Sequence, residues 1–334
     1  ISMSEYMVSV KAWALPKSRR EEAPHYSKAQ VATVLEQVAT LLKLKDANPF
    51  RIRAYENGAR IIASLDEDLW ELSQSGKITE VKGIGKGIAL GLAQEGVDVS
   101  ICARRADVLE AAAQEIRDAT GANVLAIVTD LTVDDQAKKF VEDSAAQFGR
   151  IDIMVNNAGS SPGGVIEHLS EADWEQSLQL KFMGYVRCLR YVLPIMVRQN
   201  GGRVVNLIGN DGVKPSYWEI APGAANAAGQ NLTLSLADQY GKNNISFVAV
   251  NPGPVRTERW AGLVKAMARD MKLTIEEADK LAPSSIPLGR IAETEEVANL
   301  CVMLASPLMH FVNGSQIEID GGQQKSLMDR LRDR

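Results

Sequence analysis

The sequence predicts an α/β fold, a doubly wound parallel sheet with helices on both faces, preceded by a small all-α module. Three observations predict it. From about residue 97 onward, short β-rich runs alternate with amphipathic helical stretches, which is typical of right-handed βαβ units. Residues 27 to 82 show only helical periodicity. The chain has 334 residues, 46% of them hydrophobic, which is enough for one large α/β domain and a small extra one.

Composition excludes several classes of protein. The net charge is −5, and residues 27 to 95 hold nine basic and nine acidic side chains, which argues against wholesale binding of nucleic acid. No apolar run reaches the roughly 20 residues that span a bilayer, so we expect a soluble cytoplasmic protein without a membrane segment. Cys102, Cys188 and Cys301 lie far apart in apolar stretches, so we expect free thiols and no metal site.

The N-terminal quarter is expected to be helical after a poorly ordered leader at residues 1 to 26. Ser27 is an N-cap candidate for a first helix. Asn48 and Pro49 open a second helix, and Asp66 to Asp68 open a third that ends near Gly76. The first helix has an apolar face of Val31, Val34, Leu35, Val38, Leu41 and Leu42.

A glycine motif, K-G-I-G-K-G-I-A, follows at Lys82 to Ala89. Two glycines around an isoleucine at the start of a helix leave backbone N–H groups free for an oxygen anion. Together with N-P-F-R-I-R-A-Y-E-N-G-A-R-I-I-A-S-L and I-T-E-V-K upstream, residues 27 to 92 resemble the helix-hairpin-helix domain of family X DNA polymerases.

The polymerase resemblance implies a weak DNA contact in which Gly83 and Gly85 present N–H groups to a phosphate. Some members also use a lysine after the hairpin as a lyase nucleophile. The matching position here is Gly91, so we do not expect that activity. The alternative is a helical cap that uses the motif only for packing.

Downstream, strands and helices alternate strictly, which predicts a parallel sheet that binds its ligand at the carboxyl ends of the strands. The β-rich runs are Val97 to Ala103, Asn123 to Val128, Ile151 to Val155, Val204 to Ile208, Ile245 to Val250 and Gln316 to Ile319. The helical stretches are Ala106 to Thr120, Asp134 to Phe148, Ala172 to Arg198, Ala224 to Tyr240 and Glu293 to Leu304.

Polar and glycine-rich motifs follow the strands. Arg104 and Arg105 follow the first run, Asp130 and Leu131 the second, N-N-A-G the third, and N-P-G-P-V-R-T the fifth. With G-I-G-K-G-I-A, these motifs make residues 83 to 323 similar to the short-chain dehydrogenase/reductase family. The resemblance implies an NAD(P)-dependent oxidoreductase with a Rossmann-like fold and a small-molecule substrate.

The same resemblance implies the cofactor contacts. Arg104 lies 19 residues after Gly85, where an acidic residue would hold the ribose hydroxyl of NAD. An arginine there suits a 2′-phosphate, so we expect NADP in preference to NAD. Alternatively, Arg104 and Arg105 are a solvated helix start. The implied contacts are Gly83, Ile84 and Gly85 at the phosphates, Asp130 and Leu131 at the adenine, Asn157, Ala158 and Gly159 at the pyrophosphate and ribose, and Pro252, Gly253 and Val255 at the nicotinamide.

The family's catalytic residues are missing at their positions. The Asn, Ser, Tyr and Lys positions hold Lys181, Gly209, Pro222 and Asn226. We therefore expect weak or absent reductase activity, lower by several orders of magnitude. Substitute groups are Tyr217, on the loop before Pro222, and Lys181, which could act as a base or amine nucleophile if an apolar cleft lowers its pKa. Other polar residues near the expected site are His168, Asp211, Lys214 and Glu219.

The glycine motif is also where the two resemblances meet. The family's usual Thr-Gly-x-x-x-Gly-x-Gly loop keeps only its last Gly-Ile-Gly here, so we expect cofactor binding to be weak or absent. Residues Ile78 to Val81 therefore either form the first strand or stay helical, and we treat the join as a recombination of two families, natural or engineered.

We expect a helical module at 27 to 82 and an α/β domain at 83 to 334. Three functions stay open: a reductase-like domain of low activity, a DNA-binding module on an inactive scaffold, and a lyase on the same scaffold. The resemblance to the short-chain dehydrogenase/reductase family implies a homo-oligomer through the helices at Ala172 to Arg198 and Ala224 to Tyr240. Their apolar faces, which include Leu189, Val192, Leu232 and Leu236, permit that contact.

Overall fold

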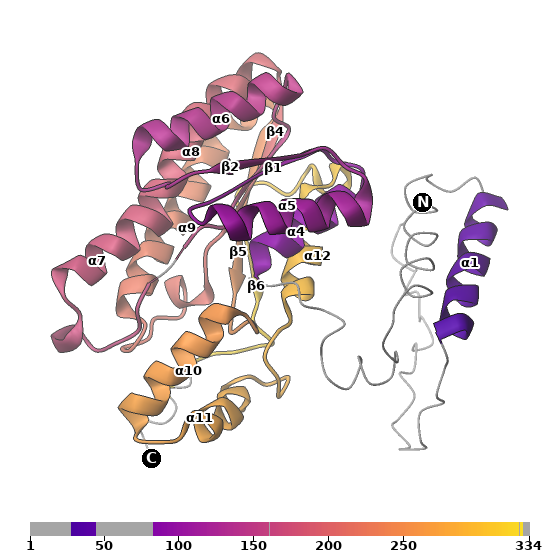
Figure 1. Ribbon diagram of the computed structural model, residues 1–334. Helices are drawn as coiled ribbons and strands as arrows, with labels where there is room; N and C mark the ends of the chain where they lie inside the picture. The colour runs from indigo at the N-terminus through magenta and orange to yellow at the C-terminus, as the bar shows by residue number, and fades with distance from the viewer. Residues whose placement is uncertain (1–27, 45–82, 160, 327, 330–334) are drawn as a thin grey trace, which may run out of the picture.

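The computed structural model describes residues 28–44, 83–159, 161–326 and 328–329 (Figure 1). Its strands form two parallel sheets, one of order β1-β2 and one of order β3-β4-β5-β6. Every described strand pairing is parallel, which confirms the α/β prediction. The strands are β1 (Val99–Ala103), β2 (Val124–Val128), β3 (Ile153–Asn156), β4 (Gly202–Leu207), β5 (Ile245–Pro252) and β6 (Ser315–Ile319).

Helices connect the strands in the alternating order that the sequence predicts. The long ones are α1 (Lys28–Leu44), α4 (Ile84–Gln94), α5 (Ala106–Thr120), α6 (Asp134–Phe148), α7 (Glu171–Ser177), α8 (Gly184–Arg198), α9 (Ile220–Tyr240), α10 (Glu258–Met271), α11 (Ile275–Leu281) and α12 (Thr294–Ala305). A π-helical segment, η3 (Leu178–Met183), joins α7 to α8. Short 3₁₀ turns are η2 (Ile166–His168), η4 (Asn210–Gly212), η5 (Gly241–Asn243), η6 (Ala282–Ser285) and η7 (Pro307–Met309).

Two hydrophobic clusters cover the two faces of the four-stranded sheet. Successive residues of β4, Val204 and Val205, fall in different clusters because neighbouring side chains in a strand point to opposite faces. Val205 packs with α4 and α12. Val204 packs with α6 and α8. The sheet is therefore covered by helices on both faces, which makes the fold doubly wound.

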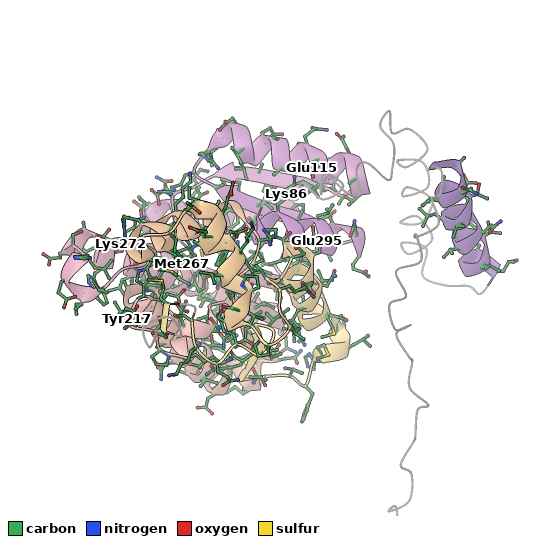
Figure 2. The ribbon with its side chains drawn as sticks, turned by 90° about the horizontal axis from the view of Figure 1, so that it is seen from below. Lys86, Glu115, Tyr217, Met267, Lys272 and Glu295 are labelled. Carbon is green, nitrogen blue, oxygen red and sulfur yellow. The ribbon has the colours of Figure 1, made fainter. Side chains whose placement is uncertain are left out.

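The helix that carries the glycine motif belongs to this core. Ile88, Ala89 and Leu92 of α4 are buried in the cluster that includes Val205. A Cβ on Gly91 would lie 2.8 Å from Cγ2 of Val302 on α12, so a glycine is needed where the two helices touch. Lys86 on the same helix forms an ion pair with Glu115 of α5 (Figure 2). In this structure α4 serves as a packing helix of the α/β domain.

Several predicted boundaries change. The single helix expected at Ala172 to Arg198 is instead α7, η3 and α8. Helix α9 begins at Ile220, four residues before the expected Ala224. Pro222 lies in the first turn of the helix, where a proline is tolerated. The segment 260 to 286, in which no motif was identified, forms α10 and α11. Both begin at threonine N-caps, Thr257 and Thr274.

The first N-terminal helix is confirmed as α1, but its predicted apolar face is wrong in part. Val34 and Leu41 are 55% and 58% exposed, whereas Ala32 and Ala39 are buried. The leader, the second and third N-terminal helices and residues 78 to 81 lie outside the described residues. The choice between strand and helix at 78 to 81 therefore stays a prediction.

The residues expected at an oligomer face pack within the protomer, and the homo-oligomer itself stays a prediction. Leu189 and Val192 are buried inside the cluster of α6 and α8, and Leu232 and Leu236 pack against it. These residues therefore stabilise the protomer itself. Within the described part of the chain, no helix combines the length and the apolar character needed to cross a membrane.

We expect Gly91→Leu to lower the free energy of unfolding by about 1 to 3 kcal/mol, because the new side chain overpacks the contact between α4 and α12. Denaturant unfolding measures the change. Gly262→Leu is the matched control, since Gly262 lies in α10 with nothing within 4 Å of its built Cβ. If both substitutions changed the free energy of unfolding equally, the close contact between Gly91 and Val302 would be contradicted.

Candidate functional site

The carboxyl ends of β1 and β2 bring together two residues predicted to hold the adenosine part of a cofactor. Arg104 is exposed directly after β1. The carboxylate of Asp130 accepts hydrogen bonds from the backbone N (2.9 Å) and Oγ1 (2.7 Å) of Thr132. These bonds lower the pKa of Asp130, and the positive charge of Arg104 lowers it further. Arg104 and Asp130 thus lie near each other at the carboxyl ends of β1 and β2.

The start of α4 lies against the end of β3. Gly83 precedes α4 with φ of 101°, a conformation that favours glycine. A Cβ on Gly85 would lie 2.7 Å from Nδ2 of Asn157. Both glycines therefore keep side chains away from the first backbone N–H groups of α4, which have no partner within the helix. This arrangement suits an anionic oxygen.

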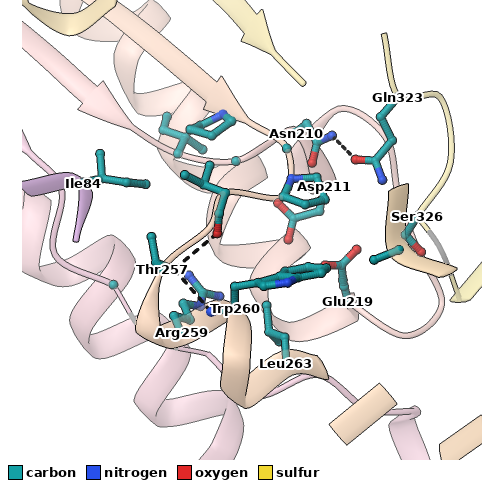
Figure 3. A pocket seen from close by; sticks show the side chains of 18 of the residues that line it. Ile84, Asn210, Asp211, Glu219, Thr257, Arg259, Trp260, Leu263, Gln323 and Ser326 are labelled. Carbon is teal, nitrogen blue, oxygen red and sulfur yellow. Dashed lines mark hydrogen bonds between the residues drawn. The ribbon is translucent and has the colours of Figure 1, made fainter. Parts of the chain in front are cut away.

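One pocket unites most of the predicted nicotinamide region (Figure 3). Its cavity volume is about 170 Å³, which is room for a group the size of one aromatic ring. Indole and aliphatic side chains of α10 and the C-terminal segment supply the apolar walls. Of the predicted residues, the lining includes Ile84, Asn157, Gly159, Lys181, Gly209, Pro252, Gly253 and Val255, but not Gly83, Gly85, Ala158, Arg104, Asp130, Leu131, Pro222 or Asn226.

Neighbouring side chains fill the space beside Gly209, which the sequence predicted at the position of the family's serine. A Cβ on Gly209 would lie 2.5 Å from Nδ2 of Asn226 and 2.7 Å from Oδ1 of Asp211. The Asn226 amide, at the position of the family's lysine, donates to the Asp211 carboxylate. Oδ1 of Asn226 is buried and has no hydrogen-bond partner among the described residues. Gly209 carries no side chain, and the Asn226 amide is engaged by Asp211.

Lys181 enters the pocket from the π-helical segment η3. The side chain is 7% exposed, and a Cβ on Gly159 would lie 3.2 Å from its Cγ. Burial lowers the pKa of Lys181 to about 8, the negative charge of Asp211 opposes the decrease, and Arg259 adds to it. A widened π turn is common at functional sites, and here it carries Lys181, which the sequence predicted as a base or amine nucleophile.

Glu219 lines the pocket. From the sequence it was one of four polar residues expected near the site, with no role assigned to it. It precedes α9, and burial raises its pKa to about 7, with a further rise from Asp211 and an opposing effect of Arg259. Arg259 and Trp260, which also line the pocket, were not predicted. The sequence feature that could have predicted them is Thr257, the N-cap of α10, whose Oγ1 accepts a hydrogen bond from the backbone N of Trp260 at 3.2 Å.

Two other candidates lie outside the pocket lining. The Tyr217 hydroxyl donates to the carbonyl of Met328 at 3.2 Å, and the Tyr217 backbone N donates to Oδ1 of Asp329. His168 is exposed in η2.

Within the described residues, no three His, Cys, Asp or Glu side chains gather as metal ligands. Cys188 and Cys301 are buried free thiols, and burial raises the pKa of each to about 12.

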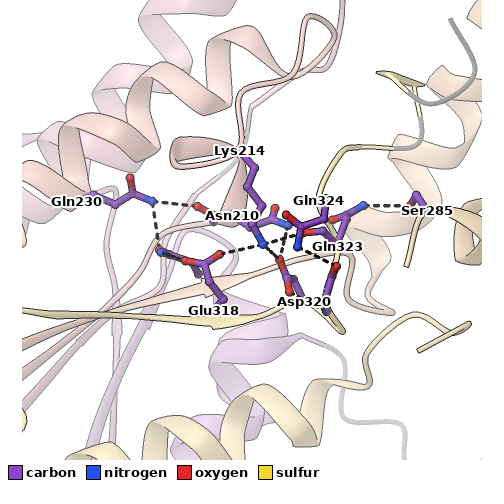
Figure 4. Close-up of polar contacts among 11 residues, drawn as sticks. Asn210, Lys214, Gln230, Ser285, Glu318, Asp320, Gln323 and Gln324 are labelled. Atoms are coloured by element: carbon purple, nitrogen blue, oxygen red, sulfur yellow. Dashed lines mark hydrogen bonds and ion pairs between the residues drawn. The ribbon is translucent and has the colours of Figure 1, made fainter. Parts of the chain in front are cut away.

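A polar network connects the pocket to the C-terminal segment (Figure 4). Lys214, expected near the catalytic groups, forms ion pairs with Asp320 and with Glu318 at 3.7 Å. Its Nζ also donates to the carbonyl of Gln323 at 2.7 Å. Asn210 donates to Gln323 at 2.9 Å. Lys214 therefore holds the loop after β4 against the segment after β6.

We expect Glu219→Gln to stabilise the protein more at pH 8 than at pH 5. The raised pKa means that the folded state favours the protonated carboxyl, so this contribution to stability is present below pH 4.5 and lost as the pH rises through about 7. The effect of the substitution on the free energy of unfolding should differ between the two pH values by an amount on the order of 1 to 3 kcal/mol, and denaturant unfolding at each pH measures it. The control is Glu175→Gln, at an exposed site, and a pH-independent effect of Glu219→Gln would be the contrary result.

Comparison with known proteins places these features in context. The 3-oxoacyl-[acyl-carrier-protein] reductase FabG of Staphylococcus epidermidis is 30% identical over 242 residues, covering 72% of this chain and 94% of the relative. FabG of Thermotoga maritima is 32% identical over 240 residues, covering 72% and 93%. The NADPH-dependent reductase BacG of Bacillus subtilis is 27% identical over 247 residues, covering 74% and 95%.

Solved structures agree on the fold. Actinorhodin polyketide ketoreductase with NADPH has a TM-score of 0.71 at 26% identity, covering 73% of this chain and 94% of that chain. The L-sorbose reductase of Gluconobacter frateurii, complexed with NADPH and L-sorbose, has a TM-score of 0.68 at 30% identity, with the same coverage.

Two family models overlap at the glycine motif. A helix-hairpin-helix domain model matches residues 27–95. The model described as enoyl-(acyl carrier protein) reductase matches residues 78–324. Both resemblances predicted from the sequence are confirmed. With its parallel sheets and the motifs at their strand ends, the chain belongs to the short-chain dehydrogenase/reductase family of NAD(P)-dependent oxidoreductases and carries a helix-hairpin-helix domain at its N-terminal side.

Proposed function

We propose that this chain binds NADP at the carboxyl ends of its strands and that it reduces ordinary ketones weakly or not at all by the family's usual proton relay. The pocket lining carries the proposal. The turn Pro252 to Val255 faces the same cavity as Asn157 and Gly159, in the arrangement that the family uses for the nicotinamide. Two catalytic positions of the family, now Lys181 and Gly209, line that cavity as well.

The residues present fit a dinucleotide. The glycines at the start of α4 leave its backbone N–H groups accessible, and Arg104 supplies a cation at the end of β1 for a 2′-phosphate. Asp130 and Leu131 would hold the adenine. Asn157, Ala158 and Gly159 would lie along the ribose and pyrophosphate. When bound, the nicotinamide ring would supply or accept a hydride, and these residues would bind and orient the cofactor.

The low reductase activity follows from the missing proton donor. A ketone that accepts hydride also needs a proton on its oxygen. Pro222 has no proton to give, Asn226 carries no charge, and the space above Gly209 is taken by the Asp211 and Asn226 side chains. A carbonyl oxygen therefore has no hydroxyl donor at the family's usual position.

The test is a fluorescence titration with NADPH combined with turnover of a panel of ketones. We expect saturable binding and oxidation of NADPH near the background rate. Steady turnover of any ketone in the panel would contradict the second half of the proposal, and an absence of binding would contradict the first.

Arg104→Glu should separate NADP from NAD. We expect the Kd for NADPH to rise about tenfold or more while the Kd for NADH changes little, because one charge-assisted hydrogen-bond partner of the 2′-phosphate is lost. The control Arg198→Glu makes the same charge change at an exposed site at the end of α8. If Arg104→Glu leaves the affinity for NADPH unchanged, Arg104 is instead a solvent-exposed residue at the start of a helix without a role in cofactor binding.

DNA contact is a second candidate function, favoured by the match of residues 27–95 to a helix-hairpin-helix domain. The position of Gly85 opposes a contact through that residue, since it faces Asn157. A mobility-shift assay across salt concentrations tests it. Binding through phosphates requires log affinity to fall as log salt rises, and an absence of any shift at low salt would remove this candidate.

A further inference from the structure

Lys181 has a setting that neither cofactor binding nor packing explains. Its stem lies over Gly159, where a Cβ would come within 3.2 to 3.6 Å of Cγ, Cδ and Cε. That contact directs the chain into the pocket instead of along the surface, where most lysines lie. No hydrogen bond or ion pair joins its Nζ to another residue of the described chain. A buried lysine without a counter-ion in contact is costly as an ammonium.

Because the charged ammonium form of Lys181 is unfavourable in this buried position, the neutral amine form is populated near neutral pH. Burial lowers the pKa of Lys181 to about 8, so a substantial share of the side chain is a neutral amine slightly above neutral pH. The charged groups that act on it are Asp211 from η4, Glu219 from the start of α9, and Arg259 from α10. A neutral amine in an apolar cleft is a nucleophile toward carbonyl carbon.

A proton acceptor and donor lies in the same cavity. Glu219 and Asp211 both line it, and Figure 3 shows their side chains near the indole of Trp260. Asp211 is engaged by Asn226. Glu219, whose pKa is raised to about 7, can both take up and release a proton near neutral pH. The walls are Trp218, Trp260, Leu263 and Met267, which favour an apolar ligand.

We propose that Lys181 captures a small, apolar aldehyde or ketone as a protonated imine, with Glu219 moving the proton. The Glu219 carboxylate takes a proton from the Lys181 ammonium, and the amine forms a C–N bond to the carbonyl carbon. The attacking nitrogen passes a second proton to the carbonyl oxygen to give a carbinolamine, and the C–O bond then breaks as Glu219 returns its proton, so the oxygen leaves as water. The sum is lysine ammonium plus carbonyl giving iminium plus water, which needs neither oxidant nor reductant. The imine would occupy the cavity proposed for the nicotinamide ring, so the capture is tested on the chain without added cofactor, and its outcome does not depend on whether NADP binds.

Benzaldehyde is a suitable probe, because the cavity of about 170 Å³ holds one aromatic ring. The full chain is incubated with benzaldehyde and sodium cyanoborohydride, which fixes an imine as a stable benzylamine, and modified lysines are mapped by peptide mass spectrometry. We expect Lys181 to be modified at least about tenfold faster than Lys265, which is exposed on α10. The rate at Lys181 should rise as the pH increases through about 8.

Matched variants separate the imine from general labelling. Lys181→Met keeps the length of the stem without the amine and should abolish the fast labelling, whereas Lys265→Met should leave it unchanged. Glu219→Gln should slow labelling of Lys181 about tenfold. Labelling spread evenly over exposed lysines, or an unmodified Lys181 peptide, would overturn the proposal. The wild-type peptide map decides this even if Lys181→Met folds poorly.

Discussion

A buried ladder of amide hydrogen bonds sets the geometry on which the candidate site depends. Asn156 at the end of β3 donates to Asn206 of β4 at 2.8 Å, and Asn206 donates to Thr233 of α9 at 2.9 Å. Thr233 in turn donates to the Gly229 carbonyl. These groups are removed from water, so each must find its partner within the protein. The ladder therefore holds the carboxyl ends of β3 and β4 in line with α9.

The functional residues follow directly from that alignment. Asn157 is the next residue after Asn156, and Gly209 lies three residues after Asn206. Gln230 on α9 continues the polar chain, since its amide donates to Asn251 at 3.3 Å, and Asn251 donates to Glu318 at 2.7 Å. Glu318 pairs with Lys214. Two hydrogen-bonded chains therefore meet at neighbouring residues of α9, Gly229 and Gln230, and the second extends to the segment that borders the pocket.

The glycine motif illustrates how one segment can satisfy two sequence families. Gly85 approaches Asn157 and Gly91 approaches Val302, so both are required by close contacts inside the α/β domain. A helix-hairpin-helix needs glycines in a similar local pattern for a different reason, the approach of a phosphate. The two family models accordingly overlap at residues 78–95. Local sequence is ambiguous here because close approach to any partner selects glycine.

Local chemistry was enough to predict the order of strands and helices, the limits of α5 and α6, and the motifs at the strand ends, since periodicity and turn residues act over a few positions. The replacement of the family's catalytic residues was predicted in the same way, from residue identity at the matching positions, and it stays a prediction. The surroundings of Lys181, Glu219, Arg259 and Tyr217 were not readable in this way. They depend on the π turn of η3 and on contacts between segments more than 100 residues apart, such as Tyr217 with Met328. Side-chain direction at such points is set by packing between distant segments, so the tertiary structure was required to find which polar groups share the pocket.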